Sequence, residues 1–258
     1  MTTSRFYIAG VIILLFFSCK QEDPQFLNLH QDVNYVGMNT CASCHLNQYN
    51  SFINTGMGKS LSLALKSNSV AMFNDPIFDD SLSLYYQPYW KNESLFVKEY
   101  NLLGRDTLHS LNQHIDYIIG SGHHTNSHLF VNNGYLYQAP FTYYVQDSIL
   151  DFPPGFENQS NSRFSRKMGL ECVACHNAYP KFVLGSENKF LNMPTGIDCE
   201  RCHGPGELHV QKISSGEMID TMHHIDYSIV NPTHLSIDLQ NDVCARCHLQ
   251  GNAVLKDR

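Results

Sequence analysis

The chain has 258 residues, of which 43% are hydrophobic and 12% aromatic, and its formal net charge is -7. This length is enough for one domain, or a domain and a half, with a buried core. The acidic balance argues against nucleic acid as a partner, because a phosphate backbone attracts basic surfaces.

Residues 1–19 have the features of an export signal. A positive charge at Arg5 precedes an apolar run over residues 6–17, which is too short to cross a bilayer as a helix. The run leads to Cys19 in a stretch that resembles a bacterial lipobox, although Phe16 stands where leucine is usual. We therefore expect Cys19 to be lipidated and to become the mature N-terminus, with cleavage elsewhere or an uncleaved anchor as the alternatives.

Such a lipoprotein would be exported and held at a membrane by its acyl chains. The expected location is the outer membrane, where the protein would face the periplasm or the cell surface. Residues 20–34 are expected to be a linker, and residues 35–258 are expected to form the folded domain.

Eight of the nine cysteines lie in four C-x-x-C-H pentapeptides, here named motif 1 (residues 41–45), motif 2 (172–176), motif 3 (199–203) and motif 4 (244–248). In such a pentapeptide both thiols form thioethers with a haem, and the adjacent histidine is the proximal ligand of its iron. Zinc ribbons and disulfides are the competing interpretations, but neither requires a histidine after every second cysteine. We therefore predict four covalently attached haem c groups. The attachment residues would be Cys41, Cys44, Cys172, Cys175, Cys199, Cys202, Cys244 and Cys247, and the proximal ligands would be His45, His176, His203 and His248.

Helices are expected around motif 1 and between the later motifs. Residues 46–52 are predicted to form a short helix that carries His45 at its start, and helix is expected to resume over residues 61–66. From residue 166 onward, short helices and turns are expected to separate motifs 2, 3 and 4.

Residues 70–150 have a different pattern, with apolar and aromatic residues at every second position. This period predicts a small antiparallel sheet inserted between the first and second haems. Its clearest hairpin is centred on Asn133 and Gly134, because these residue types supply the positive φ angles of a type I′ turn.

Several stretches between the motifs resemble one family, the tetrahaem cytochrome c module related to the electron carrier of ammonia oxidation. The stretches that carry the resemblance are residues 35–37, 118–124, 175–180, 196–198, 202–206 and 231–232. A similar module often opens larger multihaem proteins that continue into tetratricopeptide repeats. Here no such repeat follows Arg258, so the chain is either a stand-alone module or a fragment.

The resemblance implies a mainly α fold with a small antiparallel β insertion. It also implies haems in close stacked pairs that replace much of the core, with mainly bis-histidine iron. One departure affects the ligands, because Met57 stands where relatives often have a histidine.

Three residues are the principal candidates for the sixth ligand of an iron. A Gly-Pro-Gly turn directs the chain away from the haem of motif 3, so His209 is expected to bind a neighbouring iron. His124 falls on the family's Gly-Ser-Gly-x-His pattern, with His123 as the adjacent alternative. Met57 could ligate through its thioether and raise the potential of its haem, or it could simply fill the core. Further candidates are His114, His128, His223, His224 and His234, whereas no role is expected for His30.

The predicted function is electron transfer between redox partner proteins through the bound haems. One alternative is a small multihaem reductase or oxidase that acts on a nitrogen or sulfur compound at an open iron, with Arg163, Arg166 and Lys167 as a cationic entrance. Another is a docking subunit whose inserted sheet binds a larger redox complex.

Overall fold

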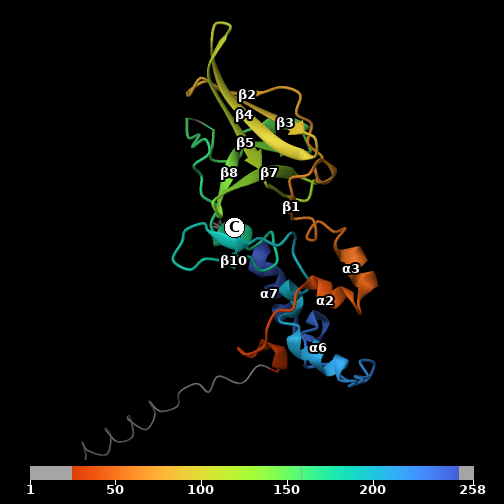
Figure 1. Cartoon of the computed structure of the whole chain (residues 1–258). Coiled ribbons are helices and arrows are strands. Elements are labelled where there is room, and N and C mark those ends of the chain that lie inside the picture. Colours follow the sequence, from red (N-terminus) through yellow and green to blue (C-terminus); the bar gives the residue numbers. More distant parts are fainter. Residues whose placement is uncertain (1–24, 158, 250–258) are drawn as a thin grey trace, which may run out of the picture.

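The structure is a computed structural model that describes residues 25–157 and 159–249 (Figure 1). The predicted export signal, its lipidated Cys19 and the first part of the predicted linker lie outside these residues. Strands gather at one end of the molecule and most helices at the other, with β10 between them (Figure 1). None of the helices in the described part of the chain is both long and apolar enough to cross a bilayer.

The prediction of a mainly α fold is wrong. Within the described residues, strands outnumber helices and form three antiparallel sheets. The helices are α2 (Met38–Ala42), α3 (Leu46–Phe52), α4 (Leu170–Val173), α5 (Glu200–His203), α6 (Glu207–Ser214) and α7 (Ile237–His248), with short 3-10 turns η1 (Leu27–Leu29), η2 (Lys66–Asn68) and η3 (Pro232–His234). Most are one or two turns long, because a C-x-x-C-H pentapeptide itself needs only about one turn of helix.

Two larger sheets form the β-rich end. One has the order β1-β6-β7-β8-β9 and the other β2-β3-β4-β5. Their strands are β1 (Leu61–Leu63), β2 (Ile77–Asp79), β3 (Leu84–Lys91), β4 (Ser94–Leu103), β5 (Asp106–Ile115), β6 (Tyr117–Ile119), β7 (Thr125–Asn132), β8 (Tyr135–Tyr144) and β9 (Ile149–Asp151). A third sheet pairs β10 (Lys181–Phe182) with β11 (Phe190–Asn192). Between motifs 1 and 2 the chain therefore forms two larger sheets in place of the one small antiparallel sheet predicted from the sequence.

The two larger sheets share one apolar core. Alternate residues of β3 and β4 point inward, as the period-two pattern predicts. The core is built from both sheets and includes Tyr86, Leu95, Val97, Ile118, Phe130 and Phe141. This shared burial stabilises strands that, in an isolated hairpin, would be only marginally stable.

Two local predictions have opposite outcomes. The hairpin between β7 and β8 is confirmed, since Asn133 has φ 52° and Gly134 has φ 85°. The prediction that helix resumes over residues 61–66 is wrong, because Leu61 to Leu63 form β1 and pair with β6. Leu61 is 1% exposed in an apolar cluster, so tertiary packing outweighs the local preference.

A buried ion pair ties the four-stranded sheet to the loop that leads to motif 2. The carboxylate of Glu99 is inaccessible and accepts hydrogen bonds from Arg163 Nε at 2.9 Å and from His109 Nε2 at 2.9 Å. Burial would raise the pKa of Glu99, but the hydrogen bonds from Arg163 and His109 outweigh it, so this pKa lies below its usual value. Arg163 is thus engaged in a structural ion pair with Glu99 and does not form part of a cationic entrance to an open iron.

We expect Arg163→Ala to lower the free energy of unfolding at pH 7 by about 2 kcal/mol, the worth of hydrogen bonds to a buried charged group. Glu99 has a depressed pKa in the folded state, so its stabilisation is present above the unfolded-state pKa and is lost as pH falls through the folded-state value. Urea unfolding at pH 7 and at successively lower pH should therefore show the difference between wild type and variant shrinking.

The control for this experiment is Arg105→Ala, which removes an exposed arginine from the turn between β4 and β5. It should change stability by no more than about 0.5 kcal/mol. Equal losses in both variants would contradict a specific role for the Glu99 pair.

Candidate functional site

Each C-x-x-C-H motif occupies a helical turn or the end of a helix. Motif 1 follows α2, motif 2 ends α4, motif 3 forms α5, and motif 4 ends α7. In motifs 1 and 3 the histidine N–H donates to the carbonyl of the first cysteine, at 2.9 Å for His45 and 3.0 Å for His203. This helical bond places the two cysteines and the histidine of a motif around one turn.

The fold brings the four motifs together in two pairs, which their sequence positions do not reveal. Cys41 in motif 1 and Cys199 in motif 3 border the same cavity, and each perturbs the pKa of the other. Their interaction raises the pKa of Cys41 and lowers the pKa of Cys199 to about 7. Burial and the nearby Cys247 of motif 4 raise the pKa of Cys175 in motif 2. Motif 1 therefore meets motif 3, and motif 2 meets motif 4.

A cavity of about 640 Å³ lies between motifs 1 and 3 and α6. Its size is in the range of sites that enclose a cofactor. Its walls include attachment and ligand candidates from both motifs and from α6, namely Cys41, Cys44, His45, Cys199, His203 and His209. His224 and His234, two of the further candidates, also line it.

Two histidines in this cavity are oriented by hydrogen bonds at Nδ1. His203 Nδ1 donates to the carbonyl of Val230 at 2.7 Å, and His209 Nδ1 pairs with Asp226 Oδ2 at 2.8 Å. A hydrogen bond of this kind at one ring nitrogen fixes the tautomer and leaves the other nitrogen free to bind a metal. Both side chains are therefore arranged as metal ligands are in proteins.

The rings of His45 and His209 both border the cavity. Their centroids are 6.3 Å apart, and their planes differ by 25°. An imidazole nitrogen lies about 2 Å from a first-row metal that it binds, so two imidazoles on one metal have centroids no more than about 6 Å apart. The centroid distance would therefore allow His45 and His209 to hold one iron.

The other two principal ligand candidates lie on neighbouring turns outside this cavity. His123 and His124 are exposed in the loop after β6, and Ser121 of that loop lies near Gly56. Met57 is 46% exposed, and its carbonyl accepts a hydrogen bond from the N–H of Ile197, just before motif 3.

Three further histidine candidates are engaged elsewhere. His128 is fully buried and stacked on Phe141 with ring centroids 4.2 Å apart, and burial lowers its pKa to about 3. It is therefore a neutral core residue of the β-rich end. His114 pairs with Asp116 and His223 pairs with Asp220, both on accessible parts of the surface.

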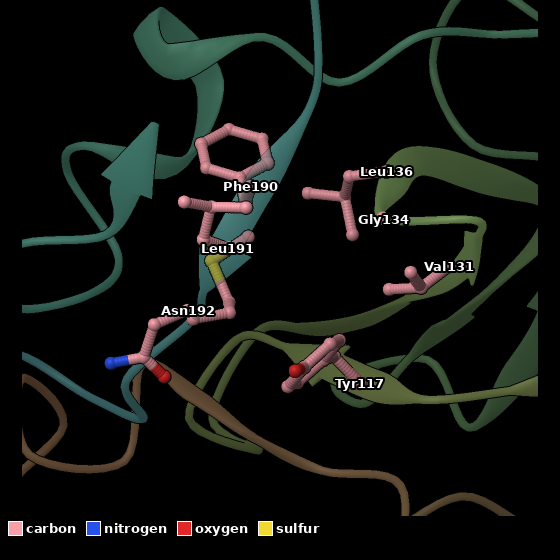
Figure 2. Close-up of a pocket in the computed structure, with 8 residues that line it drawn as sticks. Tyr117, Val131, Gly134, Leu136, Phe190, Leu191 and Asn192 are labelled. Atoms are coloured by element: carbon pink, nitrogen blue, oxygen red, sulfur yellow. The ribbon is translucent and has the colours of Figure 1, made fainter. Parts of the chain in front are cut away.

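Motif 2 lies against an apolar cluster, because Cys172 packs against Leu136 and Phe190. Leu136 and Phe190 also line a second, smaller cavity of about 310 Å³ (Figure 2). Figure 2 shows Phe190 and Leu191 of β11 on one side of this cavity, and Leu136 of β8 with Tyr117 on the other. An apolar cluster beside an attachment cysteine suits the contact of a haem edge with protein.

Two residues without a sequence signal hold motifs 1 and 3 in place. Glu200, between the cysteines of motif 3, is 1% exposed and accepts from the N–H groups of Val36 at 2.9 Å, Gly37 at 2.7 Å and Gly206 at 2.8 Å. Asn28 is fully buried and donates to the carbonyls that flank Gly204 in the turn after motif 3, at 2.9 and 3.0 Å. Neither role could be predicted from local sequence. Asn28 is more than 170 residues from the carbonyls to which it donates, and Glu200 is more than 160 residues from Val36 and Gly37.

The residues present thus fit a covalently bound haem. Attachment cysteines of different motifs lie close together, His203 and His209 are held by hydrogen bonds at Nδ1, and a cavity bordered by ligand candidates lies beside motifs 1 and 3. Bound haem would supply one-electron iron chemistry.

Comparison with known proteins agrees with this chemistry. The model of the family described as cytochrome c554 and c-prime matches residues 156–204, a segment that contains motifs 2 and 3. No curated protein matches the chain. The family match supports a multihaem c-type cytochrome that binds haem covalently and transfers electrons.

Two solved structures are similar to the chain at low sequence identity. The outer cell wall cytochrome OcwA is 17% identical with a TM-score of 0.48, and the match covers 83% of this chain and 37% of that one. The undecahaem cytochrome from the S-layer of Carboxydothermus ferrireducens is 18% identical with a TM-score of 0.44, and the match covers 85% and 26%. The chain therefore spans about a third of the length of these two cytochromes or less.

We expect Gly196→Ala to destabilise the junction between the Met57 turn and motif 3. Gly196 has φ +65°, and a Cβ there would lie 2.1 Å from the carbonyl oxygen of Gly58, so backbone must shift. Gly104→Ala is a matched control, because Gly104 has φ +62° with nothing within 4 Å. In urea unfolding the control should lose about 1–2 kcal/mol for its left-handed backbone, and Gly196→Ala should lose clearly more. Equal losses would show that the close approach to Gly58 is unimportant.

Proposed function

We propose that this chain is an exported tetrahaem c-type cytochrome that transfers electrons between redox partner proteins. The observation that carries the proposal is the pairing of motif 1 with motif 3 and of motif 2 with motif 4. Attachment cysteines that lie close together would bring the haems bound to them close to one another. Close contact between redox groups is the condition for rapid electron hopping.

In this proposal the two cysteines of each motif attach one haem, and His45, His176, His203 and His248 are the proximal ligands. His209 would supply a second histidine ligand to the iron of motif 1, and Asp226 would fix the orientation of its ring. Asp226 would also increase the ligand strength of His209 by accepting its Nδ1 proton. A site with two strong ligands favours electron transfer over substrate binding.

The proposed export and lipid anchor agree with the chemistry of haem attachment. Haem c is attached outside the cytoplasm, which requires an export signal such as residues 1–19. Gln25, the first described residue, donates to the hydroxyl of Tyr227 at 3.1 Å. Cys19 precedes it by six residues, which span at most about 21 Å, so an anchor there would hold this end near the membrane.

The number of haems is tested by intact mass and pyridine haemochrome analysis of protein made with its export signal in a cytochrome-maturing host. We expect four covalent haems. Variants that carry both cysteines of one motif as alanine should each lose one haem, because each motif attaches its own. A stoichiometry below four in the unaltered protein, or bound zinc in place of haem, would contradict the proposal.

We expect His209→Ala to convert one low-spin haem to high-spin, since it removes the proposed sixth ligand of one iron. Low-temperature EPR of the fully oxidised protein measures this change. His223→Ala is the control, because His223 is exposed and paired only with Asp220. An unchanged low-spin signal in His209→Ala would exclude His209 as a ligand. A high-spin iron already present in the unaltered protein would point to an open site and to the enzyme alternative.

A further inference from the structure

The two residues between the cysteines of motif 3 contact different neighbours. Glu200 receives the N–H groups of Val36 and Gly37, which lead into motif 1. Arg201 Nη2 donates to the carbonyl of Ala174 inside motif 2 at 2.7 Å, and its Nε donates to the carbonyl of Asn177 at 3.1 Å. Motif 3 therefore presents a carboxylate to motif 1 and a guanidinium to motif 2.

A second guanidinium lies next to Arg201, on the side of motif 3 that contacts motif 2. Arg246, between the cysteines of motif 4, donates to the carbonyl of Arg201 at 3.2 Å and to the hydroxyl of Tyr179 at 3.4 Å. Arg201 itself lies over the ring of Tyr179, with its Cζ 4.2 Å from the ring centroid. Tyr179 thus holds both cations at the junction of motifs 2, 3 and 4.

Carboxylates border the side of motif 3 that contacts motif 1. Glu200 lines the cavity of motifs 1 and 3, and so does Asp226. Among the described residues that line this cavity there is no lysine or arginine. The cavity is therefore bordered by negative charge, whereas the junction is bordered by positive charge.

We propose that Glu200, Arg201 and Arg246 order the haem potentials, with the haem of motif 1 lowest and the haem of motif 2 highest. This inference rests on the proposed tetrahaem function. Reduction adds an electron to a haem, so a nearby cation favours the reduced state and a nearby carboxylate favours the oxidised state. Electrons would then run downhill from the cavity side of the molecule toward the junction beside the β-rich end.

The test is a spectroelectrochemical titration of the purified holoprotein as Arg201→Gln and as Arg201→Lys. Loss of the charge in Arg201→Gln should lower the highest midpoint potential by about 59 mV, a tenfold change in the ratio of reduced to oxidised haem. The lowest potential should be unchanged. Arg201→Lys keeps the charge and should restore most of the difference. In a variant with Cys172 and Cys175 both as alanine, the highest-potential component should be missing.

Three results would overturn the inference: an unshifted highest potential in Arg201→Gln, equal shifts in the glutamine and lysine variants, or loss of a different component when motif 2 is removed. If Arg201→Gln does not fold, Arg246→Gln removes the second guanidinium of the junction, which is more exposed. This variant should also lower the highest midpoint potential. Haem is counted in every preparation. Fewer than four haems in the unaltered protein would refute the proposed function, whereas four haems with unshifted potentials would refute only this ordering.

Discussion

The carboxylate of Glu200 accepts three backbone N–H groups from two segments, one of which lies more than 160 residues away in the chain. Leaving buried donors of this kind unpaired would cost the full desolvation of each group. Asn28 adds a similar tie to the turn after motif 3. Together these contacts fasten residues 28–37 onto motif 3, beside the cavity that His45 and His209 border.

The β-rich end has a corresponding role for motif 2. The N–H of Met168 donates to the carbonyl of Leu136 at 3.0 Å, and the N–H of Phe190 donates to the carbonyl of Gly134 at 2.9 Å. Segments on both sides of motif 2 therefore pair with the hairpin of β7 and β8. The inserted sheets act as a rigid support for this motif, so they belong to the architecture of the site.

The four motifs are consequently held by contacts between residues that the haem-attachment pattern leaves unspecified. Glu200 reaches toward motif 1, Arg201 reaches to motif 2, and Arg246 reaches to motif 3. These three side chains hold the motifs in contact, and they also carry charges next to the motifs. A substitution at one of these positions therefore affects both the geometry and the electrostatics of the site.

The sequence by itself determined the features that depend on local spacing. The C-x-x-C-H pattern specifies its chemistry within five residues, Asn133 and Gly134 specify a turn, and residues 46–52 form the expected helix. Tertiary structure decided the rest. It drew Leu61 to Leu63 into a strand, made sheets the larger part of the fold, paired motif 1 with motif 3, and buried His128 while it turned His209 toward His45. These outcomes rest on contacts between residues far apart in the chain, which no local pattern encodes.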